Sequence, residues 1–367
     1  MRTDYDVIVV GAGPAGCAAA YDLATAGRRV LIVDRFEFPR TKACAGGLTV
    51  KTILALRFSI APVVRTVCGD LNVGLRGAKP RRITGKAPLC AMTVRAELDE
   101  FVLRETRRRG AQFAQIGRIR SITADCSKVT MVTETGTMTA RFLIGADGAN
   151  STVARLTGEF PEATAGFAME GHVPATGAFD MEFNFDVVQS GYGWVFPKGD
   201  HVNVGIYTSK PGKGIVTLER LREYARAKTG AADLSQVVGH PVGLGGTAYR
   251  PRSPRTFLVG DAAGLVDPLF GEGIYYAVVS GQAAAAAVIE GTQYEKQLRH
   301  IQRDLRACRN SAERFYGDPD RWYPLLTSAI GRYALTRGVA AGRTTGSILK
   351  RPYTVPFSRP PRLPLPA

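Results

Sequence analysis

Apolar segments and glycine turns alternate at the start of the chain. The run from Tyr5 to Val10 predicts a buried strand, and the turn GAGPAG at residues 11–16 follows it directly. Pro14 opens a predicted helix that continues to Ala26. The segment RRVLIVD at residues 28–34 is the next predicted strand, so the pattern indicates a βαβ unit of a parallel sheet.

The spacing of apolar residues changes twice further along the chain. Leu98, Val102 and Leu103 lie at helical spacing and predict a helix from about Arg95 to Arg109. From about Thr164 to Thr208, apolar and polar residues alternate between short turns, which is typical of an antiparallel sheet.

The last third of the chain returns to the first pattern. The segment from Arg255 to Ile274 reads as a buried strand with glycine turns, and an alanine-rich helix and further helical material follow it. The tail at residues 351–367 carries six prolines, so neither a helix nor a central strand is expected there.

These patterns predict an α/β fold, α+β overall. We expect a Rossmann-like dinucleotide-binding domain with a mostly antiparallel substrate domain inserted in it. The expected boundaries are 1–60, 93–160 and 250–292 for the dinucleotide-binding domain, 61–92 and 161–249 for the substrate domain, 293–350 for a helical C-terminal region and 351–367 for the tail.

The net charge of +16 narrows the range of partners. Such a surface suits nucleic acid or the anionic face of a membrane, or it is simply solvated. No nucleic-acid-binding module accompanies the charge, so nucleic acid is not expected. No run approaches the roughly 20 apolar residues of a transmembrane helix, and the N-terminus does not read as a signal peptide. We therefore expect a cytoplasmic protein, with peripheral membrane contact as the alternative to a purely solvated surface.

The six cysteines are scattered and form no CxxC pair or metal-ligand spacing. Disulfides and a metal site are therefore not expected, and most cysteines should be small buried residues. Cys44 differs because it lies in the small-residue segment ACAGG, with Arg40 and Lys42 nearby. These two cations favour a thiolate at Cys44.

The turn at residues 11–16 has the chemistry of a dinucleotide site. Gly11 permits the tight turn, Gly13 lets the backbone approach a pyrophosphate, and Gly16 allows close packing of the helix on the strand. The amides and dipole at the helix start would bind the phosphates. Asp34 ends the next strand and is expected to accept hydrogen bonds from ribose hydroxyls.

Four separated segments carry a resemblance to a known family. GADGANSTVAR (145–155) and FLVGDAAGLVDPLFGEGI (257–274) are similar to the second and third signatures of FAD enzymes with the aromatic-hydroxylase fold. Together with FPRTKACAGGL (38–48) and YGWVFP (192–197), they resemble the geranylgeranyl reductase family of flavoproteins over most of residues 5–300. Members of that family reduce isolated double bonds in isoprenoid chains of lipids, chlorophylls and related molecules.

The resemblance implies which residues hold FAD. Asp261 would bind a ribityl hydroxyl, and Gly271 and Gly273 would leave room for the flavin ring. Arg95 corresponds to an arginine that contacts the cofactor in related flavoproteins, with a solvent-facing helix arginine as the alternative. The residues expected to bind FAD are Gly11, Gly13, Pro14, Ala15, Gly16, Asp34, Arg35, Cys44, Ala45, Gly47, Arg95, Ile119, Asp147, Gly260, Asp261, Gly271, Gly273 and Ile274.

Two of these positions have open alternatives. Cys44 would lie over the working face of the flavin and is the one candidate catalytic residue, with an inert buried cysteine as the alternative. Ala45 beside it stands where the family often has glycine. Asp147 either meets the cofactor region or fixes a structural turn with Gly148.

The segment YGWVFP is expected to form the substrate site. Alternate residues of a strand share one face, so Tyr192, Trp194 and Phe196 can wall a slot for a prenyl chain, with Pro197 at its end. The aromatic rings would supply a large apolar contact surface. A sheet core is the alternative.

The strand that returns after this segment departs from the family pattern. Gly205 matches the first returning glycine, but Tyr207 stands where a second glycine is usual. The length of the pocket and the identity of the substrate are therefore open. His172 and His201 in the same sheet are expected to be structural, and no histidine is assigned as a catalytic acid.

The expected function is that of an FAD-dependent reductase that saturates C=C bonds of a prenyl chain on a lipid, pigment or quinone-like molecule. The only dinucleotide fingerprint is used for FAD, so the electron donor is either NADPH bound without a signature or a ferredoxin. One alternative is a flavin monooxygenase, with a halogenase as a narrower form that Tyr192 and Phe196 disfavour. The other is a non-catalytic flavin-binding redox partner.

Overall fold

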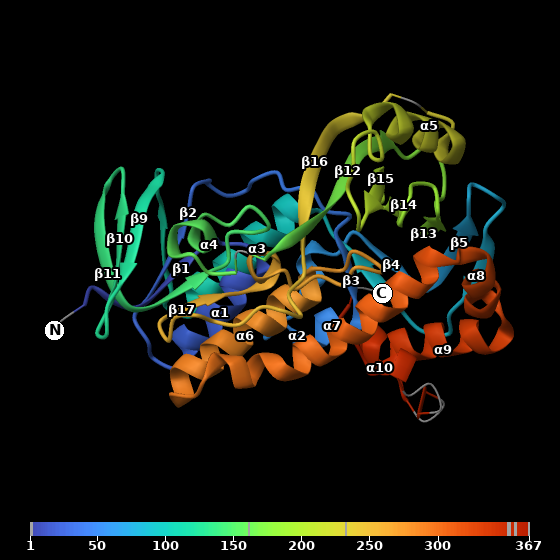
Figure 1. Ribbon diagram of the computed structural model, residues 1–367. Coiled ribbons are helices and arrows are strands. Elements are labelled where there is room, and N and C mark those ends of the chain that lie inside the picture. The colour runs from blue at the N-terminus through green and yellow to red at the C-terminus, as the bar shows by residue number, and fades with distance from the viewer. Residues whose placement is uncertain (1–2, 161, 232, 351–353, 356–357, 366–367) are drawn as a thin grey trace.

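Strands from the start, middle and end of the chain form one sheet. The computed structural model describes residues 3–160, 162–231, 233–350, 354–355 and 358–365. The first sheet has the order β8-β2-β1-β11-β10-β9, with β17 beside β11 (Figure 1). β9 and β10 run antiparallel to their neighbours, and the other pairs are parallel. The bounds are β1 (Tyr5–Val10), β2 (Val30–Asp34), β8 (Gln112–Gln115), β9 (Ile119–Ala124), β10 (Val129–Thr133), β11 (Gly136–Gly145) and β17 (Thr256–Leu258).

Helices with small residues at their contacts pack on this sheet. α1 packs against both α3 and α6, and α6 also contacts α2 and α7. Val7, Ile8 and Val9 of β1 are fully buried, as expected for a central parallel strand. The helix bounds are α1 (Pro14–Thr25), α2 (Val50–Ala55), α3 (Arg95–Arg108), α4 (Thr152–Thr157) and α6 (Ile274–Glu290), with short 3-10 helices η1 (Ala61–Val63) and η2 (Gly260–Ala263).

The second sheet has the order β16-β12-β15-β14-β13-β5-β6. It is antiparallel except where β13 runs parallel to β5. The third sheet is small, with the order β3-β7-β4. The bounds are β3 (Gly47–Thr49), β4 (Thr66–Cys68), β5 (Asp70–Leu75), β6 (Arg81–Thr84), β7 (Cys90–Met92), β12 (Thr164–Pro174), β13 (Glu182–Phe185), β14 (Gly191–Pro197), β15 (His201–Thr208) and β16 (Ser235–Leu244).

The two faces of the second sheet have different partners. Helix α5 (Leu218–Thr229) covers one face, where Leu221 and Tyr224 pack with Val195 and Val204. Trp194 points to the opposite face and belongs to a separate apolar cluster. Because neighbouring residues of a strand point to opposite faces, β14 supplies both surfaces.

The C-terminal region is helical, and its helices α7–α10 lie together on one side of the molecule (Figure 1). α7 contacts α6, α8 and α10. Residues 358–365 form neither helix nor strand, and Leu363 and Leu365 pack against the core of the first sheet. The rest of the proline-rich tail lies partly outside the described residues. The bounds are α7 (Tyr294–Gly317), α8 (Pro319–Thr327), α9 (Ala329–Ala340) and α10 (Thr345–Lys350).

Candidate active site

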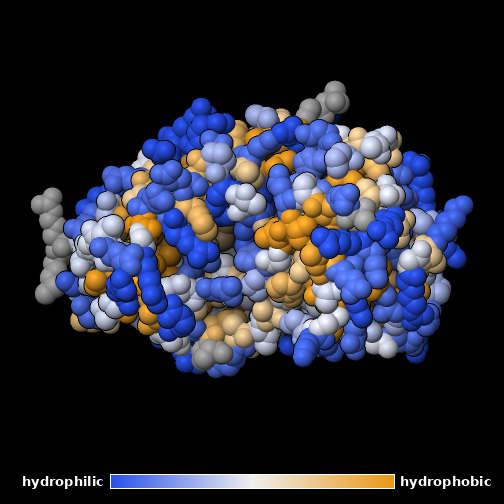
Figure 2. Space-filling view, turned by 90° about the horizontal axis from the view of Figure 1, so that it is seen from above, coloured by the Kyte–Doolittle hydropathy of each residue, from blue (hydrophilic) through white to orange (hydrophobic). Residues whose placement is uncertain are grey.

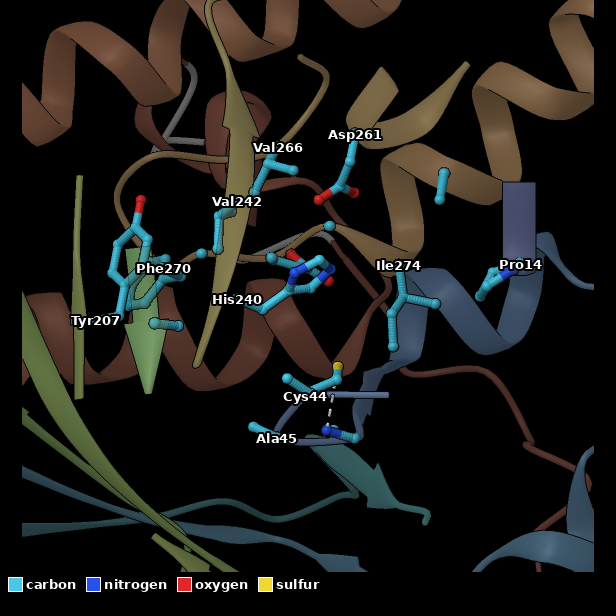
Figure 3. A pocket seen from close by; sticks show the side chains of 18 of the residues that line it. Pro14, Cys44, Ala45, Tyr207, His240, Val242, Asp261, Val266, Phe270 and Ile274 are labelled. Carbon is cyan, nitrogen blue, oxygen red and sulfur yellow. Dashed lines mark hydrogen bonds between the residues drawn. The ribbon is translucent and has the colours of Figure 1, made fainter. Parts of the chain in front are cut away.

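A cavity of about 1380 Å³ connects three parts of the molecule. Its walls come from the glycine turns of the first sheet, from strands of the second sheet and from helices α7–α10. On the face shown in Figure 2, apolar residues gather beside a hollow near the middle of the molecule. Figure 3 shows Asp261, His240, Cys44 and Ile274 arranged around the same space.

Two helix N-termini open onto one end of the cavity. α1 begins at Pro14 and α6 at Ile274, and both residues line the cavity. Gly11 has a φ of +105°, and a Cβ atom there would lie 2.4 Å from a backbone carbonyl oxygen, so only glycine fits this turn. At Gly13 an added Cβ would meet only Arg40 Nη2, at 3.6 Å. The first amides of a helix lack partners within the helix, so both ends can bind an anion.

Small residues bring these two helix ends together. A Cβ atom at Gly281 would lie 2.2 Å from the carbonyl oxygen of Ala15, and one at Gly16 would lie 1.9 Å from that of Gly11. A Cβ atom at Gly260 would lie 3.2 Å from the side chain of Ala15. Gly16 and Gly260 thus allow close packing at this point, which is the role that the sequence predicted for Gly16.

Two aspartates hold turns at this end of the cavity. Asp34 is 9% exposed, and its two carboxylate oxygens accept backbone amides at 2.9 and 3.0 Å. Asp147 accepts the Ser151 hydroxyl at 2.6 Å and two amides at the start of α4, at 2.7 and 3.1 Å. Asp147 therefore fixes the turn that was one of its two expected roles, and both aspartates also line the cavity. A carboxylate has further lone pairs, so each can still accept a ligand hydroxyl.

A lysine–histidine pair and a buried aspartate lie next to these turns. Lys42 Nζ is hydrogen-bonded to His240 Nε2, and Gly243 N donates to Asp261 Oδ2 at 3.3 Å. Burial, together with the Arg95 cation, lowers the pKa of Lys42 to about 8. Burial raises the pKa of Asp261, and the Lys42 cation opposes this rise.

The ACAGG loop lies between two buried side chains of opposite charge. Glu170 Oε1 accepts a hydrogen bond from Cys44 N at 2.9 Å, and Lys198 Nζ donates to the carbonyl oxygen of Ala45. Burial raises the pKa of Glu170 and lowers that of Lys198 to about 8. A Cβ atom at Gly46 would lie 2.2 Å from the backbone carbonyl oxygen of Thr93, so the loop also packs closely against the backbone at Thr93. Both charged residues come from the second sheet, which thus positions a loop of the first.

Arg95 is buried and does not face solvent. Its Nε and Nη2 donate to the Asp99 carboxylate at 2.9 and 2.8 Å. Burial opposes the charge of Arg95, but Asp99 and the neighbouring Cys44 outweigh it and raise the pKa of Arg95. Arg40 was expected to act on Cys44, and its Nη2 instead lies 3.3 Å from the same Asp99 carboxylate. Arg95 is therefore a buried cation that lies beside the Cys44 thiol at the start of α3.

The aromatic side chains of β14 form a wall farther along the cavity. Tyr192, Trp194 and Phe196 are 5%, 4% and 7% exposed, and all three line the cavity. Trp194 Nε1 donates to Asn203 Oδ1 at 2.6 Å. A Cβ atom at Gly205 would lie 2.0 Å from the Trp194 ring, so this glycine lets the indole lie across the neighbouring strand.

Tyr207 extends the aromatic wall and fastens it to the loop before α6. Its ring centroid lies 5.3 Å from that of Tyr192, and its hydroxyl donates to the carbonyl oxygen of Pro268 at 3.3 Å. The Tyr192 hydroxyl donates to the carbonyl oxygen of Phe270 in the same loop. The Tyr207 ring therefore fills space that a glycine would leave open.

The structure brings most of the predicted site residues to this one cavity. Gly16, Gly260 and Pro197 do not line it, and His172 and His201 stack on each other outside its lining, with ring centroids 4.5 Å apart. The predicted residues that line it are Gly11, Gly13, Pro14, Ala15, Asp34, Arg35, Cys44, Ala45, Gly47, Arg95, Ile119, Asp147, Tyr192, Trp194, Phe196, Asp261, Gly271, Gly273 and Ile274.

Sequence reasoning missed several charged or titratable residues of the site, among them the ion pair Lys51–Glu272. Glu170 interrupts an otherwise apolar strand, which is a signal for a buried acid with a partner. Lys198 and His240 carry no comparable signal, because their partners are far away in the sequence. Asp99 lies four residues after Arg95 on α3, a spacing that permits their ion pair.

The residues present fit a dinucleotide cofactor with a ring system. The glycine turns and two helix ends offer backbone amides to phosphates, and Asp34 and Asp261 can accept hydroxyl groups. The volume of about 1380 Å³ exceeds the roughly 300–1,000 Å³ of an ordinary small-molecule pocket. The cavity therefore has room for a cofactor and a second ligand together.

Two features, a metal cluster and a membrane-spanning helix, are absent from the described residues. Within the described residues, no group of histidine, cysteine, aspartate and glutamate side chains is arranged to hold a metal ion. In the same part of the chain, no helix combines the length and apolar character needed to cross a membrane.

Comparisons with known proteins agree with the geometry. Residues 4–191 match the family model described as an FAD binding domain. A menaquinone reductase of Mycolicibacterium smegmatis is 32% identical, over 79% of this chain and 78% of the relative. A geranylgeranyl diphosphate reductase of Rhodobacter capsulatus is 31% identical, over 78% of this chain and 75% of the relative. A solved geranylgeranyl bacteriochlorophyll reductase-like protein of Thermoplasma acidophilum has the same fold, with a TM-score of 0.72, 22% identity and coverage of 97% and 96% of the two chains.

Proposed function

This chain belongs to the geranylgeranyl reductase family of FAD-dependent oxidoreductases, and on that premise we propose that it saturates C=C bonds in a prenyl chain. The prenyl chain would be part of a lipid, a pigment or a quinone-like molecule. The single observation that carries this proposal is the continuity of the cavity, which joins the glycine turns to an aromatic wall and an apolar helical end.

The predicted site residues divide between cofactor and substrate. The glycine turns, Asp34, Asp261 and the loop around Cys44 hold FAD, which supplies a hydride when it is bound and reduced. Tyr192, Trp194 and Phe196 hold the prenyl chain. An isolated alkene is weakly polarised, so these residues act by aligning the chain and excluding water and oxygen. Their burial supports that role.

Cys44 is the catalytic residue that we assign to the cofactor face. The hydrogen bond from its amide to Glu170 fixes its backbone, and Gly46 N donates to its Sγ at 3.4 Å. Arg95 reaches the same thiol. The thiol is thus held at the cavity wall, where contact with the flavin ring would tune that ring.

The Lys42–His240 pair is the proton source that we assign to the reaction. Both side chains line the cavity, and the pair can hold or move a proton between Nζ and Nε2. The pKa of Lys42, lowered to about 8, makes its ammonium group a stronger acid than an ordinary lysine while it still holds its proton near neutral pH, as a general acid requires. The proton would reach the alkene carbon that does not receive the hydride.

Two partners follow from the same proposal. The electron donor is NADPH or a reduced ferredoxin, since the one dinucleotide fingerprint of the sequence is allotted to FAD. The substrate is collected at an anionic membrane surface, where the net charge of +16 supports peripheral contact.

Turnover of a lipid panel tests the function. The FAD-loaded protein, reduced chemically under argon, is mixed with detergent-dispersed geranylgeranyl lipids, pigments and menaquinones, and mass spectrometry follows the gain of two hydrogens for each bond. We expect saturation of at least one compound. Failure across the whole panel would overturn the proposal. In a parallel reaction in air, a hydroxylated product with substrate-stimulated oxygen use would identify a monooxygenase instead. FAD binding with neither reaction would point to a non-catalytic flavoprotein.

A variant of Lys42 tests the proposed proton source. Lys42→Met should lower turnover by roughly 10²- to 10⁴-fold, the usual contribution of a general acid. The matched control Lys86→Met removes an exposed lysine of the second sheet's edge region and should leave turnover unchanged. Turnover of Lys42→Met that equals wild type, with full FAD content, would exclude Lys42 from the proton path.

A further inference from the structure

Helices α8–α10 carry an apolar surface at the far end of the cavity. Leu325 and Leu349 line the cavity and are themselves 56% and 47% exposed, so the cavity reaches the surface at these helices. Ile330 and Tyr333 lie on α9, other residues of which line the cavity, and are 83% and 48% exposed. These four residues form the helical apolar patch.

The helical apolar patch stands out from the rest of the surface. Eight large apolar side chains are exposed in the described part of the chain, and four of them belong to this patch. The others include Phe36, Leu218 and Val237, which come from separate elements. Single exposed apolar residues are ordinary, but a group of them around a cavity opening marks a contact surface.

The charge of the same region is mostly of one sign, because Asp320 is the only acid of α8–α10 and it forms an ion pair with Arg76. Residues 321–367 contain eight lysines and arginines and neither aspartate nor glutamate, which accounts for half of the net charge of +16. Among the described residues, no carboxylate forms an ion pair with any of these basic side chains. Arg337 instead lies over the Tyr333 ring, and Arg321 over the Trp322 ring. In the part of the chain that the structure describes, these cations are therefore not neutralised by any carboxylate.

We propose that the helical apolar patch docks this protein on the anionic surface of a lipid bilayer. The apolar residues would enter the headgroup region, the basic residues would meet anionic lipids, and the cavity mouth would face the membrane. A prenyl chain could then pass from the bilayer to the aromatic wall without crossing water. The inference rests on the proposed function for its substrate and on the patch for its partner.

Charge complementarity selects the bilayer over a second copy of the chain. A symmetric dimer through this patch would place the cations of both copies face to face, and Asp320, the only acid of α8–α10, is already paired with Arg76. An anionic bilayer supplies the opposite charge over a wide area. Tyr333 and Trp322 are residue types that favour the membrane–water interface.

Vesicle flotation with the FAD-loaded full chain tests the docking. The protein should float with vesicles of phosphatidylcholine and phosphatidylglycerol and remain unbound with phosphatidylcholine alone, and added salt should weaken the binding. The double variant Leu325→Gln/Ile330→Gln should reduce flotation by about tenfold. The matched control Leu218→Gln/Val237→Gln changes exposed apolar residues elsewhere and should leave flotation unchanged.

A charge variant and a spectroscopic signal sharpen the test. Arg332→Gln should weaken binding by about fivefold, the usual contribution of one basic residue near an anionic surface. Arg222→Gln on α5, also exposed and outside the patch, is the control. Brominated phospholipids should quench Trp322, because the other of the two tryptophans, Trp194, is 4% exposed and far from solvent.

The outcomes separate this inference from the proposed function. Turnover in detergent without flotation would overturn the docking and leave the function standing. Flotation that depends on the patch, without turnover of any prenyl compound, would leave the docking standing and overturn the function. A dimer that Leu325→Gln/Ile330→Gln dissociates, with no binding to vesicles, would make the patch an interface between copies and overturn the inference.

Discussion

The two ends of the cavity present different kinds of atoms to a ligand. At the glycine end, Gly11 and Gly13 expose backbone and the helices α1 and α6 offer their first amides. At the aromatic end, the walls are side chains, with Trp194 and Tyr207 among the most buried rings. A backbone site tolerates little change in its own residues, whereas a side-chain wall changes its shape with each substitution. The cofactor end is therefore set by turn geometry, and the substrate end by side-chain volume.

The loop around Cys44 joins these two ends. Glu170 and Lys198 reach it from the second sheet and hold its backbone by hydrogen bonds. A Cβ atom at Gly47 would lie 3.0 Å from the Phe196 ring, so the loop also touches the aromatic wall. A change in the aromatic end can thus reach the cofactor end through this loop.

Replacing Tyr207 should produce the largest effect at the aromatic end. Tyr207→Gly removes a buried ring and restores the residue that is usual in the family, so it should open the wall to longer or bulkier chains. We expect a loss of about 3–5 kcal/mol in the free energy of unfolding, as for other buried aromatic truncations. Denaturant unfolding and the product profile with chains of graded length measure the two effects.

Tyr207→Phe is the matched control for that change. It keeps the ring and removes only the hydroxyl that donates to Pro268, so the unfolding free energy should fall by about 1 kcal/mol or less. The chain-length profile should remain that of the wild type. An identical profile for Tyr207→Gly would show that this position does not set the length of the substrate.

Replacing Gly13 with a bulky residue should weaken FAD binding at the glycine end, with a smaller loss of stability than Tyr207→Gly. A Cβ atom there meets only Arg40 Nη2 at 3.6 Å, and the backbone is extended, so valine can be accommodated. Its methyl groups would then occupy the space before α1. We expect FAD affinity to fall about 100-fold, which corresponds to about 2.8 kcal/mol, with an unchanged circular dichroism spectrum.

Gly177→Val controls for the effect of the substitution itself. Gly177 is exposed and an added Cβ meets nothing within 4 Å, so FAD content should equal that of the wild type. Flavin absorbance after gel filtration measures both variants. Full flavin loading of Gly13→Val would mean that the pyrophosphate does not lie against this turn.

The sequence was most informative where local rules decide the structure. The βαβ unit, the glycine turn and the shared face of Tyr192, Trp194 and Phe196 follow from periodicity and turn chemistry, and each is present. The helix predicted to end at Ala26 ends at Thr25, and the strand predicted from Arg28 begins at Val30. These shifts are small because element ends depend on few local contacts.

Local sequence rules could not predict the contacts that depend on how the two sheets pack against each other. The pair Lys42–His240 joins residues 198 positions apart, and Glu170 meets Cys44 across 126 positions. The sequence predicted a cofactor contact for Arg95 but left a solvent-facing helix arginine open, and only the packing of α3 shows that Arg95 is buried. The electrostatic part of the site is therefore a product of tertiary structure.

A pH-dependent effect is expected from the charge that Lys198 brings to the joining loop. Its folded-state pKa of about 8 lies below the ordinary 10.5, so between these pH values the unfolded chain holds a proton that the folded protein has released. Unfolding then takes up a proton, and this residue makes the protein more stable as pH rises, by at most about 1.4 kcal/mol per pH unit. Lys198→Met lacks this contribution, so its stability relative to wild type should decline steadily from about pH 8 to pH 10.5.

Urea unfolding of wild type and Lys198→Met at a series of pH values measures the difference. Groups that titrate in this range without interacting with Lys198, such as the buried Tyr249, are common to both proteins and cancel in the comparison. The exposed Lys86→Met should show a difference that does not change with pH. If the Lys198→Met difference were equally flat, the ammonium group would not be desolvated in the folded protein. The loop around Cys44 would then be held by Glu170 without a buried counter-charge, and the aromatic end would have lost one of its two links to the cofactor end.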